Sequence, residues 1–144
     1  MVKDSKNSHV SKPEMRGGDD VLRIHELKAF VPAKCHKTSL HFYQKLGFEV
    51  LSNEGGVAYL CCGDSSFLLQ DYYEPTYASN TMMHLLVDNV QAWHRHLSSL
   101  GLEDEFGTVI SQVEERPWAM LDFTLKDPSD VLWRIAENIK GSTS

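Results

Sequence analysis

The chain has 144 residues, a formal net charge of −6, 42% hydrophobic and 24% charged residues. These values are typical of an ordinary globular domain with a core of its own. The acidic balance and the lack of a basic run argue against a nucleic-acid partner, and no apolar run is long enough to span a bilayer.

The N-terminal twenty residues are rich in Lys, Ser, Asn, Gly and Asp. We expect residues 1–20 to form a disordered tail and residues 21–140 to form one domain. The alternative, a tail that folds over the body, would rest on Val10 and Met15 alone. The three cysteines (Cys35, Cys61 and Cys62) cannot all pair within one chain, and no apolar signal segment precedes them. We therefore expect reduced thiols in a cytoplasmic protein.

Residues 21–75 predict a strand, a helix and a meander of short strands. The alternation in 21–31 places Leu27, Ala29 and Val31 on one face of a strand, with Glu26, Lys28 and Phe30 on the other. A helix is expected from about Lys37 to Leu46, ending at Gly47. Turns at 55–56 and 63–66 separate the strands that follow.

Residues 81–139 repeat the same order after a linker, Asp71–Asn80, that contains three tyrosines. Leu100-Gly101-Leu102-Glu103 echoes Leu46-Gly47-Phe48-Glu49, and Val131–Arg134 echoes Phe67–Gln70. A strand over 116–123 is expected to place Trp118, Met120 and Asp122 on one face. Each half of the chain is therefore predicted to be a β-α-β-β-β unit.

The tandem order, with F-Y-x-x-L-G-F-E in the first unit and D-P-S-x-V-L-W-R in the second, resembles the vicinal oxygen chelate superfamily. That superfamily contains the glyoxalases, the bleomycin resistance proteins and the extradiol dioxygenases. The resemblance implies an α+β fold of two tandem βαβββ units, 21–75 and 81–139. Their curled mixed sheets would enclose a shared cleft.

Metal-using relatives hold their ion with His, Glu or Gln from the first and last strands of each unit. The resemblance places Glu26, Gln70, Met82 and Arg134 at these positions. Arginine offers no lone pair and methionine is a soft ligand, so we expect neither a metal nor another cofactor. The alternative is a divalent ion on Glu26, Gln70 and His84, which would make the protein a lyase, isomerase or dioxygenase.

No other nucleophile motif replaces the metal chemistry. The resemblance then favours a protein of the bleomycin resistance type, which binds an aromatic or cationic drug or metabolite without reacting with it. The hypothesis that the protein is an enzyme is less favoured. A third hypothesis is that side chains close the cleft and no ligand binds. The expected ligand-binding residues are Glu26, Lys28, Phe30, Gln70, Met82, His84, Trp118, Met120, Asp122 and Arg134.

Two further expectations concern the cleft and the assembly. Glu26 and Arg134 are predicted to form an ion pair. The resemblance implies a homodimer, with 72–77 and the strand near Trp118 as candidate contacts. The identity of the ligand, and whether one chain or two form the cleft, stay open.

Overall fold

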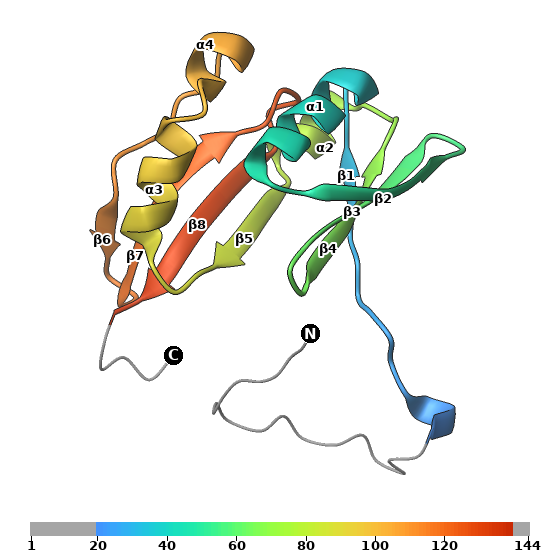
Figure 1. The fold of residues 1–144 in the computed structure, drawn as a ribbon, viewed down its shortest axis with the longest axis horizontal. Helices are drawn as coiled ribbons and strands as arrows, with labels where there is room; N and C mark the ends of the chain where they lie inside the picture. The colour runs from blue at the N-terminus through green and yellow to red at the C-terminus, as the bar shows by residue number, and fades with distance from the viewer. Residues whose placement is uncertain (1–19, 140–144) are drawn as a thin grey trace.

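The structure, a computed structural model, describes residues 20–139 (Figure 1). The predicted tail, apart from Asp20, lies outside these residues. The elements in chain order are η1 (Asp20–Leu22), β1 (Phe30–Pro32), α1 (His36–Leu46), β2 (Glu49–Glu54), β3 (Val57–Cys62), β4 (Ser65–Gln70), α2 (Pro75–Ser79), β5 (Met82–Leu86), α3 (Val90–Ser98), α4 (Leu102–Phe106), β6 (Glu114–Arg116), β7 (Met120–Lys126) and β8 (Leu132–Asn138).

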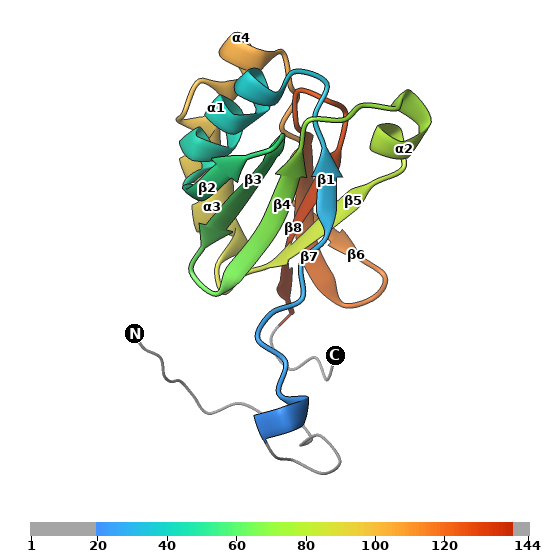
Figure 2. The same ribbon diagram turned by 90° about the vertical axis from the view of Figure 1, so that its right-hand side faces the viewer.

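The strands form two four-stranded mixed sheets, one for each unit (Figures 1 and 2). The strand orders are β1-β4-β3-β2 and β5-β8-β7-β6. In each sheet the first strand pairs in parallel with the last, and the other pairs are antiparallel. The predicted α+β fold of two repeated units is therefore confirmed.

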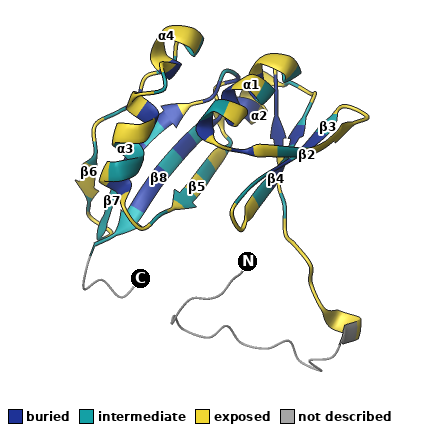
Figure 3. Ribbon diagram, viewed as in Figure 1, coloured by how far each residue is buried: buried dark blue, intermediate teal, exposed yellow. Residues whose placement is uncertain are grey.

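Each unit packs one helix against the inner face of its sheet. In α1, Phe42, Tyr43 and Leu46 are buried, and the helix ends at Gly47, whose φ of 116° is one that glycine adopts easily. In α3, the Asn89 side chain accepts a hydrogen bond from the backbone N–H of Ala92, which caps the helix start. Figure 3 shows the buried residues gathered where helices and sheets meet.

The first strand is much shorter than predicted. β1 contains only Phe30–Pro32, and the residues before it form a largely exposed arm, 21–29, whose N-terminal end runs away from the sheets (Figure 2). A strand needs backbone hydrogen bonds to a neighbour, and among the described residues those to β4 reach back only to Ala29, whose carbonyl accepts from Leu68 N. The segment 21–29, in which apolar and polar residues were predicted to alternate along a strand, is therefore not part of the sheet.

One further local prediction needs correction, and two short helices were not predicted. Trp118 lies in the turn between β6 and β7, not in a strand with Met120 and Asp122, and is 55% exposed. The linker contains a short helix, α2, whose start is capped by the Glu74 side chain. The acidic segment after α3 forms α4 between two glycines of positive φ, Gly101 and Gly107. No helix within residues 20–139 is long and apolar enough to cross a membrane.

The two units share one aromatic and polar junction. The rings of Tyr43, Phe48, Phe67 and Trp133 pack edge-on or tilted at centroid distances of 5.0–6.0 Å. Trp133 Nε1 donates to the Tyr43 hydroxyl, which donates to the buried carboxylate of Asp127. The three Trp133 ring contacts and the bonds from Trp133 to Tyr43 and from Tyr43 to Asp127 cross between the units, so this junction fixes the two sheets relative to each other.

Candidate functional site

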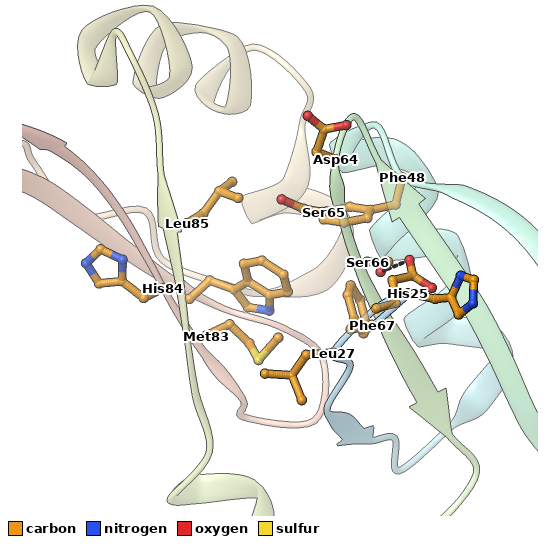
Figure 4. A pocket seen from close by; sticks show the side chains of 12 residues that line it. His25, Leu27, Phe48, Asp64, Ser65, Ser66, Phe67, Met83, His84 and Leu85 are labelled. Carbon is orange, nitrogen blue, oxygen red and sulfur yellow. Dashed lines mark hydrogen bonds between the residues drawn. The ribbon is translucent and has the colours of Figure 1, made fainter. Parts of the chain in front are cut away.

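A cavity of about 430 Å³ lies between the two sheets, beside the aromatic junction. That volume is in the range of small-molecule sites. Its lining combines residues from the arm, from the β3–β4 turn, from β5 and from β8: 25–27, Phe48, 64–67, 83–85 and Trp133. In Figure 4 the side chains of Met83, Leu85 and Leu27 extend into the space, with Phe67 and Phe48 opposite.

The apolar part of the cavity follows from strand alternation. Met83 is paired in register with Trp133, so both lie on the inner face of the second sheet, and Leu85 lies on the same face. Phe67 comes from the inner face of the first sheet and is 1% exposed. The two inner faces therefore supply an aromatic and aliphatic floor.

The polar part of the cavity carries two carboxylates, Asp64 and Glu26. Glu26 accepts hydrogen bonds from Lys28 Nζ at 2.7 Å, Ser66 Oγ at 2.7 Å and the Tyr59 hydroxyl at 2.8 Å. These bonds, the Lys28 bond first, lower the pKa of Glu26 to about 2. Glu26 is therefore ionised at neutral pH, with its charge paired to Lys28, while Asp64 at the same mouth has no cation partner among the described residues.

The ten residues predicted to bind the ligand divide between two places. Glu26 and Lys28 lie on the arm at the first sheet, and Lys28 Nζ is 4.8 Å from the centre of the Tyr59 ring. Phe30 and Gln70 lie on β1 and β4 of that sheet. The others belong to the second sheet or its β6–β7 turn: Met82, His84, Trp118, Met120, Asp122 and Arg134.

The second sheet has an outer face that we define by its paired rows: Met82, Leu132 and Lys126; His84, Arg134 and Thr124; Leu86, Ala136, Asp122 and Glu114; Met120, Asn138 and Arg116. Residues paired in register share a face, and the side chains of Met83, Leu85 and Trp133 line the cavity from the opposite face. Figure 4 shows the His84 ring on the other side of β5 from Met83 and Leu85.

On this outer face Asp122 is 0% exposed and joins two arginines. Its Oδ1 accepts from Arg116 Nε at 2.8 Å and its Oδ2 accepts from Arg134 NH1 at 2.9 Å. The sequence grouped Asp122 with Arg134, but Arg116 was missed. The predicted strand over 116–123 already placed it by alternation on the same face as Asp122, but the turn at 117–119 that returns β6 beside β7 was not predicted.

The predicted ion pair between Glu26 and Arg134 is wrong for this chain, since each has other partners. The cause is a register error. Phe30 pairs with Leu68 and Met82 pairs with Leu132, so Met82 corresponds to Phe30 and not to Glu26. Glu26 lies four residues before β1, where no repeat position corresponds to it.

The metal implied by the enzymes of the fold family does not fit the residues at these positions. Arg134 is cationic and bonded to Asp122, while Glu26 is bonded to Lys28. His84 and Gln70 lie on different sheets, and the His84 ring faces away from Glu26's cavity (Figure 4). Within residues 20–139, no three His, Cys, Asp or Glu side chains gather as a metal would need.

Two repeated βαβββ units, with open mixed sheets and a cavity between them, define the class of this protein. The family model described as "Glyoxalase/Bleomycin resistance protein/Dioxygenase superfamily" matches residues 23–135. The chain belongs to this superfamily. No curated protein sequence matches it significantly.

Solved structures with the same fold include binding proteins and an enzyme. A bleomycin resistance determinant encoded on a transposon has a TM-score of 0.70 at 23% identity, with 80% of this chain and 98% of that chain covered. The bleomycin-binding protein of Streptomyces verticillus, in complex with copper(II)-bleomycin, has a TM-score of 0.64 at 20% identity, covering 81% and 98%. A lactoylglutathione lyase from Agrobacterium tumefaciens has a TM-score of 0.59 at 17% identity, with 80% of this chain and 95% of that chain covered. At these identities the likeness establishes the fold.

Proposed function

We propose that the protein binds a small aromatic or cationic molecule in the cavity between its two units and sequesters it without reacting. The observation that carries this proposal is the composition of the cavity. An aromatic and aliphatic floor, formed by Phe67, Trp133, Met83 and Leu85, lies below a mouth that holds the carboxylate of Asp64 beside the Glu26–Lys28 ion pair. A flat ring gains from stacking and burial on such a floor, and a positive charge gains from the carboxylate.

The bleomycin-binding proteins among the structural relatives make bleomycin the first probe. Because the cavity is about 430 Å³, it suits a drug-sized molecule or one ring system of a larger one. Proflavine, a small planar cation, is therefore the second probe.

Binding is tested by thermal shift and by calorimetric titration. At a concentration about 100 times its dissociation constant, a ligand of the native state adds about 2.7 kcal/mol to the free energy of unfolding. The melting temperature should then rise by several degrees. If neither probe, nor a wider set of aromatic cations and antibiotics, shifts melting, the binding proposal fails.

Two neighbouring leucines allow a matched test of the location. Leu85 extends into the cavity, whereas Leu86, the next residue of β5, is exposed on the outer face. Leu85→Trp should fill part of the cavity and abolish binding, and Leu86→Trp should leave it intact. Equal binding by both variants would place the ligand elsewhere.

The sequestering role also requires that no metal be involved. We expect elemental analysis of protein purified without chelator to give well below one divalent ion per chain. About one ion per chain, lost to a chelator together with an activity on a glyoxalase-type substrate, would favour the enzyme instead.

We further propose that the chain forms a homodimer and acts in the cytoplasm. The arm exposes Val21, Ile24 and Leu27 at 84%, 68% and 93%, an apolar surface that another copy would cover. The exposed Tyr72, Tyr77 and Trp118 are further candidates for the contact. Light scattering should give about twice the 16.3 kDa chain mass, and a single-chain mass would refute the dimer.

The three free thiols fit a reducing compartment, which cell fractionation would check.

A further inference from the structure

The floor of the cavity contains one side chain with a polar hydrogen. Of Phe67, Met83, Leu85 and Trp133, only Trp133 has one, the N–H of its indole. Trp133 is 3% exposed, and a buried N–H without an acceptor is costly. Its Nε1 donates to the hydroxyl oxygen of Tyr43 at 2.8 Å. The indole N–H is therefore engaged by the protein rather than available to a ligand.

The Tyr43 hydroxyl is held in turn by a carboxylate of the other unit. Tyr43 lies on α1 and is 0% exposed, and its hydroxyl donates to Asp127 Oδ2 at 2.5 Å. Burial, together with the charge of Asp127, raises the pKa of Tyr43 well above its ordinary value, so the phenol keeps its proton. Because that proton points to Asp127, the oxygen of Tyr43 is left to accept from Trp133.

Asp127 is fixed by the backbone of its own turn. Its Oδ1 accepts from the N–H groups of Ser129 at 2.7 Å and Val131 at 3.0 Å, between β7 and β8. A carboxylate bonded to backbone has little freedom to rotate. Asp127, Tyr43 and Trp133 thus form a chain of hydrogen bonds that runs from this turn to the cavity floor, and a buried polar chain of this kind is rigid when each member has its partner.

The ring contacts of Trp133 do not by themselves select one orientation of the indole. Its ring centre lies 5.5 Å from that of Tyr43, 5.8 Å from that of Phe48 and 5.6 Å from that of Phe67. Apolar contact is non-directional, and the χ2 torsion of tryptophan has two broad wells about 180° apart. A hydrogen bond is directional, so the bond to Tyr43 distinguishes the two wells.

We propose that Tyr43 and Asp127 are positioning residues for the cavity, which hold the Trp133 indole in one orientation and thereby set the affinity for a flat aromatic ligand. This inference rests on the proposed function, because it concerns the same cavity. Tyr43 and Asp127 do not line the cavity, so they act on a ligand through Trp133. Without the Tyr43 hydroxyl, the buried N–H would gain an acceptor by turning toward the water of the cavity, which would change the floor.

The first test is calorimetric titration with proflavine at about pH 8, where Asp127, with a pKa of about 6, is ionised. Tyr43→Phe keeps the ring and should raise the dissociation constant about fivefold, the effect of one lost hydrogen bond. Asp127→Asn serves if that variant does not fold, because an amide has one acceptor oxygen where the carboxylate has two. Equal binding by the unaltered chain and the variant would overturn the inference.

Ser129→Ala is the matched control. It removes another buried hydroxyl that links the two units, the acceptor of Lys34 N, without a bond to the indole. Proflavine should bind this variant as it binds the unaltered chain. A loss of affinity equal to that of Tyr43→Phe would mean that any loosening of the junction weakens binding, and would refute a specific role for Tyr43.

A double-mutant cycle tests whether Tyr43 acts through Trp133. Trp133→Phe keeps an aromatic ring in the floor but has no N–H. Adding Tyr43→Phe to this variant should cause no further loss of affinity, because the bond that Tyr43 accepts is already absent. A further loss of about fivefold would show that Tyr43 acts by another route and would refute the inference.

The indole N–H resonance of Trp133 gives a readout that needs no ligand. It is identified in the NMR spectrum by its absence from Trp133→Phe. In Tyr43→Phe it should shift and exchange with water severalfold faster, and in Ser129→Ala it should stay as it is. An unchanged resonance in Tyr43→Phe would overturn the inference. Absence of proflavine binding to the unaltered chain would instead refute the proposed function, and this inference with it.

Discussion

Two carboxylates that each bind a cation behave differently because one is exposed and the other is buried. Glu26, on the exposed arm of the first unit, bonds to Lys28, Tyr59 and Ser66. Asp122, fully buried in the second unit, bonds to Arg116 and Arg134. Water screens the first ion pair, whereas the second is enclosed by the side chains that it binds. The same kind of contact, a carboxylate bonded to a cation, therefore lines the cavity mouth in the first unit and holds two arginine side chains against the sheet in the second.

A third carboxylate sharpens the comparison, because Asp127 is buried without any cation. It accepts from the Tyr43 hydroxyl and from the backbone N–H groups of Ser129 and Val131. Burial outweighs these bonds and raises the pKa of Asp127 to about 6. The pKa of Glu26 moves the opposite way, to about 2.

The largest effect is expected from Asp122→Ala. The substitution leaves Arg134 without its counter-charge and Arg116 with only the exposed Glu114, and should lower the free energy of unfolding by about 4 kcal/mol. Urea denaturation measures this loss. Glu114→Ala is the control, because Glu114 bonds to the same Arg116 but is 61% exposed, and it should change little. Similar losses in the two variants would contradict the distinction between buried and exposed carboxylates.

The next effect is a pH dependence caused by Asp127. Its pKa in the folded chain lies above the ordinary value of 3.8, so protonation stabilises the fold. This contribution is complete below about pH 4 and is lost as the pH rises through about 6. Asp127→Asn cannot titrate, so the stability of the original chain relative to this variant should fall by about 3 kcal/mol from pH 3 to pH 8. A difference independent of pH would show that Asp127 titrates normally.

A smaller effect is expected from a buried contact without charge. Ser129 Oγ accepts from Lys34 N at 2.8 Å and lies 3.4 Å from Ser39 Oγ, so it links the two units. Ser129→Ala should cost about 1–2 kcal/mol, because the Lys34 N–H loses its acceptor. Chemical denaturation checks this value, with the exposed Ser52→Ala as the control. A loss of stability as large as that of Asp122→Ala would mean that the charge of Asp122 does not explain the larger effect expected there.

The smallest effect on stability is expected from Glu26→Gln, at the exposed end of the comparison. The unfolding midpoint should not move measurably, since the ion pair is screened by water. The arm should nevertheless be cut faster by trypsin after Lys28, whose partner is weakened. Glu54→Gln, an exposed change in β2, should leave the cutting rate unchanged. A clear drop in the midpoint of Glu26→Gln would show that the arm belongs to the folding core.

Local sequence patterns determined the repeated architecture. Gly47 marks the end of α1, the turns at 55–56 and 63–64 separate β2, β3 and β4, and the echo of Phe67–Gln70 in Val131–Arg134 aligns the last strands. These signals work because helix ends, turns and alternation depend on neighbours along the chain. They were enough to predict two βαβββ units and the superfamily.

Only the tertiary structure decided where the predicted site residues lie. Alternation shows that Met82 and His84 share a face of β5, but not whether that face meets the first unit or points away from it. The length of β1, its register and the burial of Asp122 all depend on partner strands far along the chain. The sequence therefore determined which residues belong together on each strand. Packing between the units decided that Met83 and Leu85 face the cavity while Arg134 and Asp122 lie on the opposite face of the same sheet.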